Sequence, residues 1–142
     1  MIRSAVPEDA RACASILNDW IDATPWMPRV HPPDDVERHY RESVLPQQRV
    51  FVAEHDGRID GFVAVAADGE TVSGLYLAPE ARGRGLGPAL LDAVREGPQR
   101  LWTFRTNEGA RRFYAREGFH EVRQTEGDNE EGLLNILFGR GI

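Results

Sequence analysis

The sequence predicts an α/β fold, in which helices cover the faces of a mixed sheet. Two Asp-Gly pairs, Asp56-Gly57 and Asp68-Gly69, join three apolar segments by tight turns, which is the pattern of antiparallel strands. Further along, an apolar segment runs into a glycine-arginine loop that opens a helix, and this order predicts parallel strands around the loop. Helix and strand patterns then alternate through the last third of the chain.

Each element follows from its local pattern. The order is strand, helix, helix, three strands, helix, strand, helix and two strands. We expect strands at residues 2–6, 49–54, 59–66, 71–77, 100–106, 119–124 and 133–138. We expect helices from Pro7, from Asp34 or Asp35 to Val44 before Pro46, from Leu86 to a stop at Gly97, and from Asn107 to Gly118. The sheet therefore has about seven strands and about four helices, and residues 1–142 form one domain.

Composition bounds the class of function. The chain has 142 residues, 41% hydrophobic and 28% charged, with a net charge of −6 that argues against nucleic-acid binding. All seventeen basic residues are arginine, which excludes a lysine Schiff base or a lysine general base. No apolar run approaches membrane-spanning length, and the first ten residues are not a secretory signal. We therefore expect a cytoplasmic protein without a membrane partner.

The only cysteine, Cys13, excludes an intramolecular disulfide and a cysteine-rich metal site. It shares the apolar face of a predicted helix with Ala10, Ala14 and Leu17, which indicates core packing. A catalytic thiol is the alternative.

The stretch from Leu75 to Gly87 carries the clearest functional signal. Bare amides at the mouth of a helix, together with the helix dipole, form an anion site that most often holds a phosphate. Arg82 and Arg84 add two permanent positive charges. A nucleoside-triphosphate loop needs a lysine, and a dinucleotide loop needs a third glycine where this chain has Pro88. A flexible glycine turn is the remaining structural alternative.

The spacing Arg82-x-x-Gly85-x-Gly87 after a strand resembles the acyl-CoA signature of the GNAT superfamily of N-acyltransferases. The stretch from Asn107 to Phe119, with Phe113-Tyr114 and Gly118, is similar to the second signature of that superfamily, although a helix cap and core residues would produce the same pattern. The opening residues, from Ile2 to Ala10, also resemble the start of many members.

The resemblance implies a GNAT-like fold whose sheet is splayed at the acyl-CoA site. It implies an acetyl-CoA-dependent N-acetyltransferase (EC 2.3.1.-) whose acceptor is a small-molecule or peptide amine, attacking directly in a ternary complex, with no metal. Family members often dimerise, so the resemblance leaves open whether this chain forms a homodimer. The coenzyme-contacting residues implied by the resemblance are Leu75, Tyr76, Leu77, Arg82, Gly83, Arg84, Gly85, Leu86, Gly87, Asn107 and Tyr114.

Tyr114 aligns with the family tyrosine that protonates the departing thiolate, and its structural alternative is a half-buried aromatic residue. Many members carry a polar base just before the Leu-Tyr-Leu segment, where this chain has Ser73-Gly74. The base is therefore open, with Glu70 and Glu130 as candidates beside His31 or a base acting through water. Gly74 is the expected place for the bulge that splays the sheet.

The proline-rich segment from Thr24 to Asp34 carries the expected acceptor-site residues, which are Trp26, Met27 and His31. Large apolar groups on a loop either pack into the local core or line a cleft. Because the family base is missing, a non-catalytic acyl-CoA sensor is the alternative function. Nucleotide binding is a third, weaker interpretation.

Overall fold

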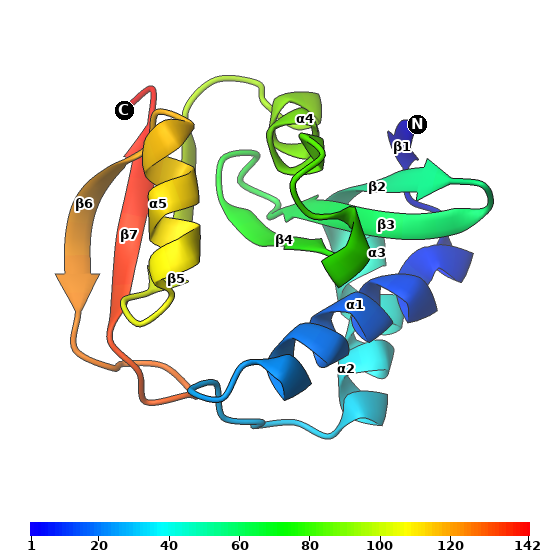
Figure 1. The fold of residues 1–142 in the computed structure, drawn as a ribbon, viewed down its shortest axis with the longest axis horizontal. Helices are drawn as coiled ribbons and strands as arrows, with labels where there is room; N and C mark the ends of the chain where they lie inside the picture. The colour runs from blue at the N-terminus through cyan, green and yellow to red at the C-terminus, as the bar shows by residue number, and fades with distance from the viewer.

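The computed structural model describes residues 1–142 and divides seven strands between two sheets (Figure 1). The first sheet has the order β1-β2-β3-β4 and the second the order β5-β7-β6, and all neighbours within each sheet are antiparallel. The strands are β1 (Ile2–Ser4), β2 (Arg49–His55), β3 (Arg58–Val65), β4 (Val72–Leu77), β5 (Gln99–Phe104), β6 (His120–Thr125) and β7 (Asn135–Arg140).

The two sheets meet at a single point. An isolated parallel bridge joins Thr71 to Arg100, and the Arg100 N–H donates to the Glu70 carbonyl at 3.0 Å. Beyond this bridge β4 and β5 diverge, as Figure 1 shows. The structure thus confirms a mixed arrangement: the first four strands are antiparallel, and β4 and β5, which precede and follow the glycine-arginine loop in the sequence, meet in one parallel bridge and then splay apart.

Four helices of seven residues or more pack on the sheets: α1 (Ala10–Ala23), α2 (Pro33–His39), α4 (Leu86–Ala93) and α5 (Glu108–Arg116). Helices α1 and α2 share one apolar cluster with the first sheet, whereas α4 contributes to a second cluster on the opposite face. Helix α5 lies against the second sheet (Figure 1). The predicted fold class and number of helices are confirmed.

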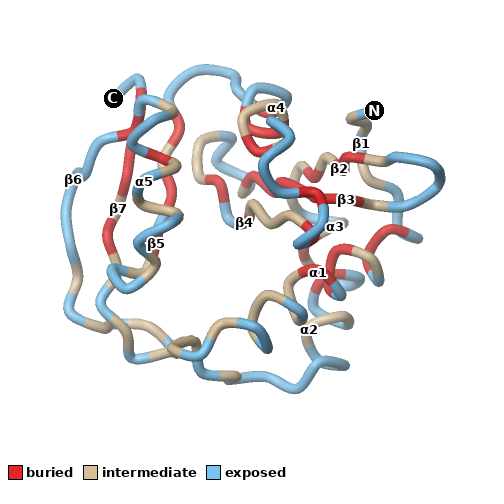
Figure 2. The backbone as a smooth tube through the Cα atoms, in the orientation of Figure 1, coloured by how far each residue is buried: buried red, intermediate tan, exposed pale blue.

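Buried residues concentrate where these layers meet (Figure 2). Phe62 of β3 is fully buried against the α1 side, and burying such a side chain contributes about 1.5–3 kcal/mol. Cys13 is fully buried in the same cluster, and burial raises the pKa of its thiol to about 12. The prediction that Cys13 packs in the core is therefore confirmed.

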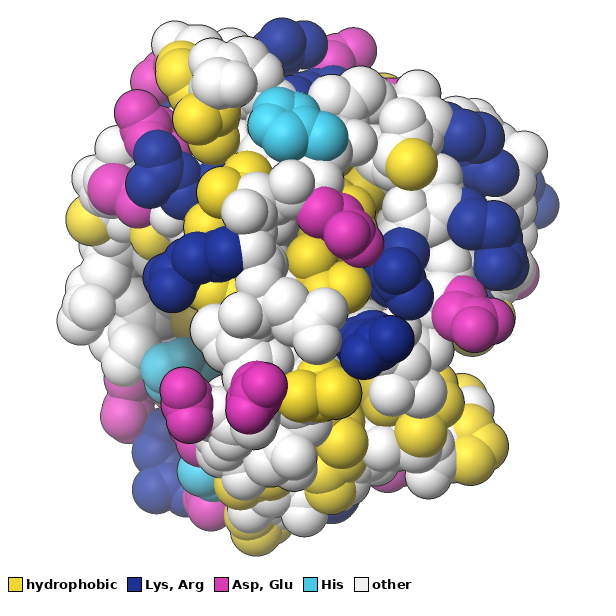
Figure 3. Space-filling model, turned by 90° about the vertical axis from the view of Figure 1, so that its left-hand side faces the viewer, with side chains coloured by type: hydrophobic (Ala, Val, Ile, Leu, Met, Phe, Trp, Pro, Cys, Tyr) yellow, Lys and Arg dark blue, Asp and Glu magenta, His cyan; other side chains and the backbone are white.

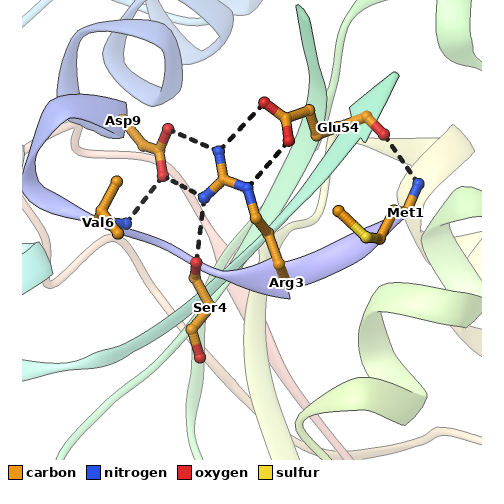
Figure 4. Close-up of polar contacts among 6 residues, drawn as sticks. All are labelled: Met1, Arg3, Ser4, Val6, Asp9 and Glu54. Carbon is orange, nitrogen blue, oxygen red and sulfur yellow. Dashed lines mark hydrogen bonds and ion pairs between the residues drawn. The ribbon is translucent and has the colours of Figure 1, made fainter. Parts of the chain in front are cut away.

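Strand β1 is held by a branched ion pair (Figure 4). The Arg3 guanidinium donates to Asp9 at 2.8 Å and to Glu54 of β2 at 3.1 Å, while Asp9 also accepts the Val6 N–H at 2.8 Å. The Arg3 hydrogen bonds hold the pKa of Asp9 below its usual value. This contact links β1, the start of α1 and the first sheet.

The second helix departs from the prediction. After α2 the chain continues through wide π-type turns at Tyr40–Val44 and a short segment α3 (Leu45–Gln47), so it does not end before Pro46. Pro46 occupies the first turn of that segment, where its missing N–H costs nothing. Buried Tyr40 and Val44 hold the intervening turns against the first sheet.

Several other boundaries also shift. Strand β1 is shorter than predicted and ends at Ser4. Strand β7 begins at Asn135 rather than Leu133, because the Asn129 side chain bonds both the N–H and the carbonyl of Leu133 and keeps it in the turn. Helix α4 ends at Ala93, before Gly97, and Arg49 donates to the Val94 carbonyl at 2.7 Å.

Candidate active site

The divergence of β4 and β5 opens a cleft of about 770 Å³. Its walls are β4, the loop before α4, β5 and one side of α5. Of the residues predicted to contact the acyl donor, Arg84 alone does not line the cleft. Those that do are Leu75, Tyr76, Leu77, Arg82, Gly83, Gly85, Leu86, Gly87, Asn107 and Tyr114.

The loop before α4 presents a row of backbone amides without acceptors. Gly83 and Gly85 have φ values of 77° and 78°, which only glycine adopts without strain. The amides of Gly83, Arg84 and Gly85 donate no hydrogen bond within the protein. Leu86 and Gly87 lie in the first helical turn, where amides have no intrahelical acceptor. Five consecutive N–H groups are thus available to one ligand.

The charges at this loop favour an anion. Arg82 and Arg84 are exposed and pair with no carboxylate, so both guanidinium groups are available. The α4 dipole adds roughly half a positive charge at the same end. This combination of free amides, helix N-terminus and arginines suits a diphosphate.

Helices α4 and α5 approach closely beside the loop. A Cβ atom on Gly87 would lie 2.9 Å from the Phe113 ring, so no larger residue fits without moving that ring. At the other ends of the two helices, the buried side chains of Gln99 and Arg140 join them, with Arg140 donating to Gln99 at 2.8 Å. Gln99 donates to the Leu91 carbonyl of α4 at 3.2 Å, and Arg140 donates at 2.9 Å to the carbonyl of Glu117, which caps α5. The wall of the cleft is therefore fixed at two places.

The expected bulge lies next to Gly74. Pairing of β3 with β4 steps from Ala64–Gly74 to Val65–Val72, which leaves Ser73 as an extra residue. Beyond the bulge, β4 pairs only with β3, so its other edge is unpaired along the cleft. The structure supports the prediction of an irregularity that directs β4 away from β5.

Asn107 and Tyr114 stand on the opposite wall. The Asn107 side chain accepts the Ala110 N–H at 3.1 Å, which confirms it as the cap of α5 and leaves its NH₂ group for a ligand. Tyr114 is buried among Phe113, Phe119 and Phe138. Burial, and secondly the proximity of Tyr76, raise the pKa of Tyr114 above its usual value, so its hydroxyl stays protonated at neutral pH.

The candidate bases fall in two places. Glu70 pairs with Arg100 at 2.9 Å at the narrow end of the splay and does not line the cleft. Glu130 lies on the loop between β6 and β7. Its Oε2 atom lies 2.6 Å from Nε2 of His31, which belongs to the loop that follows α1. The structure thus brings Glu130 and His31 together and separates Glu70 from them, and none of the three lines the cleft.

Aromatic side chains gather where α1 and the loop after it approach the cleft. Trp26 packs edge-on against Phe104 of β5 and against Trp20 of α1, with ring centroids 6.0 and 5.9 Å apart. The ring centroid of Trp20 in turn lies 5.4 Å from that of Tyr76 in β4. Met27 is half-buried in the same loop. No local signal in the sequence indicates that Trp20 and Phe104 both pack against Trp26.

Known proteins resemble this chain over nearly all of its length. A family model described as "Acetyltransferase (GNAT) domain" matches residues 46–121, more than half of the chain. The peptidyl-lysine N-acetyltransferase YiaC of Escherichia coli strain K12 is 31% identical over 132 residues, which cover 86% of this chain and 84% of YiaC. The chain belongs to the GNAT acetyltransferase family.

Solved GNAT structures share its fold. The apo form of YjaB from Escherichia coli superposes with a TM-score of 0.78 at 23% identity, covering 98% of this chain and 95% of YjaB. YncA from Salmonella typhimurium, solved with its cofactor acetyl-CoA, gives a TM-score of 0.71 at 23% identity, covering 98% and 91% of the two chains. The GNAT fold is therefore confirmed, and the protein is an acyltransferase of a family that uses acetyl-CoA.

Two surface findings complete the description of this GNAT protein. None of its helices combines the length and the apolar character needed to cross a bilayer. On the side formed by β6, arginine and carboxylate groups are interspersed among apolar side chains (Figure 3). No single sign of charge dominates that face, which is therefore not built to attract a polyanion.

Proposed function

We propose that this GNAT protein transfers an acetyl group from acetyl-CoA to a primary amine of a peptide or small molecule. The observation that carries the proposal is the cleft between β4 and β5, with five unbonded amides and Arg82 at its rim. The similarity to YiaC, a peptidyl-lysine N-acetyltransferase, supports a lysine side chain as the acceptor.

The donor fits the cleft in two parts. Its diphosphate would accept hydrogen bonds from the amides of residues 83–87, and Arg82 and Arg84 would neutralise its charge. Its pantetheine amides would pair with the free edge of β4 along Leu75–Leu77, as an added strand pairs with a sheet edge. The Asn107 NH₂ group would donate from the opposite wall.

The substrate amine must lose a proton to a base before it reacts. An amine with the pKa of lysine, about 10.4, costs about 4 to 5 kcal/mol to deprotonate at pH 7. Glu130 and His31 are in contact on the acceptor side, and we assign the base to this pair, directly or through water. Glu70, tied to Arg100 outside the cleft, is the second candidate.

The free amine nitrogen attacks the thioester carbonyl carbon, a C–N bond forms, and the oxygen gains negative charge. A backbone N–H near Leu77 would stabilise this oxyanion, and such donors commonly supply about 3 kcal/mol. The carbonyl then re-forms, the C–S bond breaks, the sulfur leaves with the electron pair, and the nitrogen gives its extra proton to water. Tyr114, kept protonated by its buried site, donates its proton to the sulfur as general acid and is reprotonated from solvent.

Two measurements test this function. Calorimetry with acetyl-CoA tests donor binding, and release of free thiol with a panel of primary amines tests turnover. We expect binding and amine-dependent release. Binding without release with any amine would favour the sensor alternative, whose structural support is Ser73, bonded to Gln48, at the position of the family base. No binding at millimolar acetyl-CoA would refute both functions.

A further inference from the structure

We propose that four half-buried rings, Trp20, Trp26, Tyr76 and Phe104, form an aromatic bridge that selects primary amines on an extended apolar stem and rejects polyhydroxylated amines such as amino sugars. The inference rests on the proposed function and deepens it, because it names the acceptor class. The rings belong to α1, the loop after it, β4 and β5, so the bridge spans both sheets.

The bridge borders the cleft that an acceptor must reach. Trp20, Tyr76 and Phe104 line the cleft, and Trp26 covers two of them from outside. All four rings keep part of their surface in solvent, in contrast to Phe62 behind Tyr76, which is fully buried. Exposed ring surface beside a catalytic cleft gains free energy when an apolar stem covers it.

The surrounding charges suit a cation. Ring faces attract an ammonium group, and the attraction grows as water is excluded. The loop between β6 and β7 carries Glu130, which contacts His31, and Glu131 next to it. A protonated amine would therefore meet the carboxylates of this loop as well as the rings. Hydroxyl groups on a sugar would lose water against these rings without gaining partners.

Stem length gives the first test. In thiol-release assays with unbranched primary amines from propylamine to hexylamine, we expect kcat/KM to rise about threefold to fourfold per added methylene, because each buried methylene contributes about 0.8 kcal/mol. Glucosamine should react at least tenfold more slowly than hexylamine. Equal rates, or a preference for glucosamine, would overturn the inference.

Substitution of the bridge gives the second test. Trp26→Ala should raise KM for hexylamine about tenfold or more and leave KM for acetyl-CoA unchanged, and Trp26→Phe should restore most of the loss. Val30→Ala provides a matched control, since Val30 is an exposed residue of the same loop and carries no ring. If Trp26→Ala folds normally and keeps the wild-type KM for hexylamine, the bridge does not bind the acceptor.

A binding measurement separates this inference from the proposed function. Hexylamine and glucosamine are titrated against the protein with coenzyme A present, and tryptophan fluorescence is followed. Quenching by hexylamine alone supports the bridge even if no amine is acetylated, and only the transferase function then fails. Acetylation of amines without selective quenching or stem preference would retain the transferase and refute the bridge.

Discussion

Under the proposed function, the two sides of the cleft would recognise their ligands by different means. The donor side would rely chiefly on the backbone: amides of residues 83–87 and the free edge of β4. The proposed acceptor side would rely on side chains from separate elements, with rings and the Glu130–His31 contact. A backbone site depends on a few conformations that glycine permits, whereas a side-chain site can change one residue at a time. Donor binding is therefore the constrained half, and acceptor choice is the adaptable half.

The largest expected effect concerns Tyr114, the proposed general acid. Tyr114→Phe should lower kcat by about a hundredfold to ten-thousandfold, the usual contribution of a general acid, while acetyl-CoA affinity stays unchanged. Stopped assays and calorimetry measure the two quantities. Tyr40→Phe removes a hydroxyl from a buried ring outside the cleft and should leave kcat unchanged. An equal loss of donor affinity in Tyr114→Phe would mean that Tyr114 binds rather than catalyses.

Gly85→Ala tests whether the donor side depends on backbone conformation. A side chain at φ 78° costs about 1–2 kcal/mol and shifts the neighbouring amides, so we expect the dissociation constant for acetyl-CoA to rise about tenfold. Gly57→Ala imposes a similar strain, φ 75°, in the turn between β2 and β3, and should cost stability without weakening donor binding. Equal donor affinities in the two variants would disprove the backbone description.

The arginines should matter less than the amides. Arg82 lines the cleft and Arg84 does not, so Arg82→Gln should weaken acetyl-CoA binding about twofold to fivefold and Arg84→Gln by a smaller factor. Both wild-type contributions are screened by salt, and the difference between wild type and Arg82→Gln should shrink as ionic strength rises. A larger loss in Arg84→Gln would place the diphosphate differently on the loop.

The smallest effect concerns the narrow end of the splay. Hydrogen bonds from the hydroxyl and N–H of Thr71 and the N–H of Glu70 lower the pKa of Asp68 to about 2. Because the folded value is depressed, this stabilisation is present above about pH 4 and disappears as pH falls toward 2. Asp68→Ala should therefore unfold at lower denaturant concentration at pH 7, and its difference from wild type should narrow between pH 4 and 2. A constant difference across that range would contradict this account.

The donor side could be predicted from sequence because its determinants are local. Glycines at positions of left-handed backbone, a proline in the first helical turn and Asn107 as a cap each have a direct signature within a few residues. The fold followed from the same kind of signal, since Asp-Gly turns and apolar periods fix neighbouring strands. The π-type turns after α2 escaped prediction because tertiary packing of Tyr40 holds them.

The acceptor side and the supports of the cleft depend on distant pairs. Trp20 meets Tyr76, and Trp26 meets Phe104, only once the two sheets are placed beside α1. The Gln99–Arg140 hydrogen bond likewise joins residues 41 positions apart. No local pattern distinguishes such residues from ordinary core or strand positions, so Trp26, Met27 and His31 could be chosen in advance only by their place in an irregular loop, and Glu130 only by its place in a polar turn.

The extra residue in β4 has a consequence for the protein without ligand. Two edge strands that begin side by side at Thr71 and Arg100 would ordinarily form backbone hydrogen bonds along their whole length. Ser73 is the extra residue of β4 just after this bridge, so the register needed for pairing β4 with β5 is lost after one pair. The extra residue therefore keeps the outer backbone N–H and carbonyl groups of β4 from pairing with β5. Under the proposed function, these groups stay free for the amides of the acyl donor.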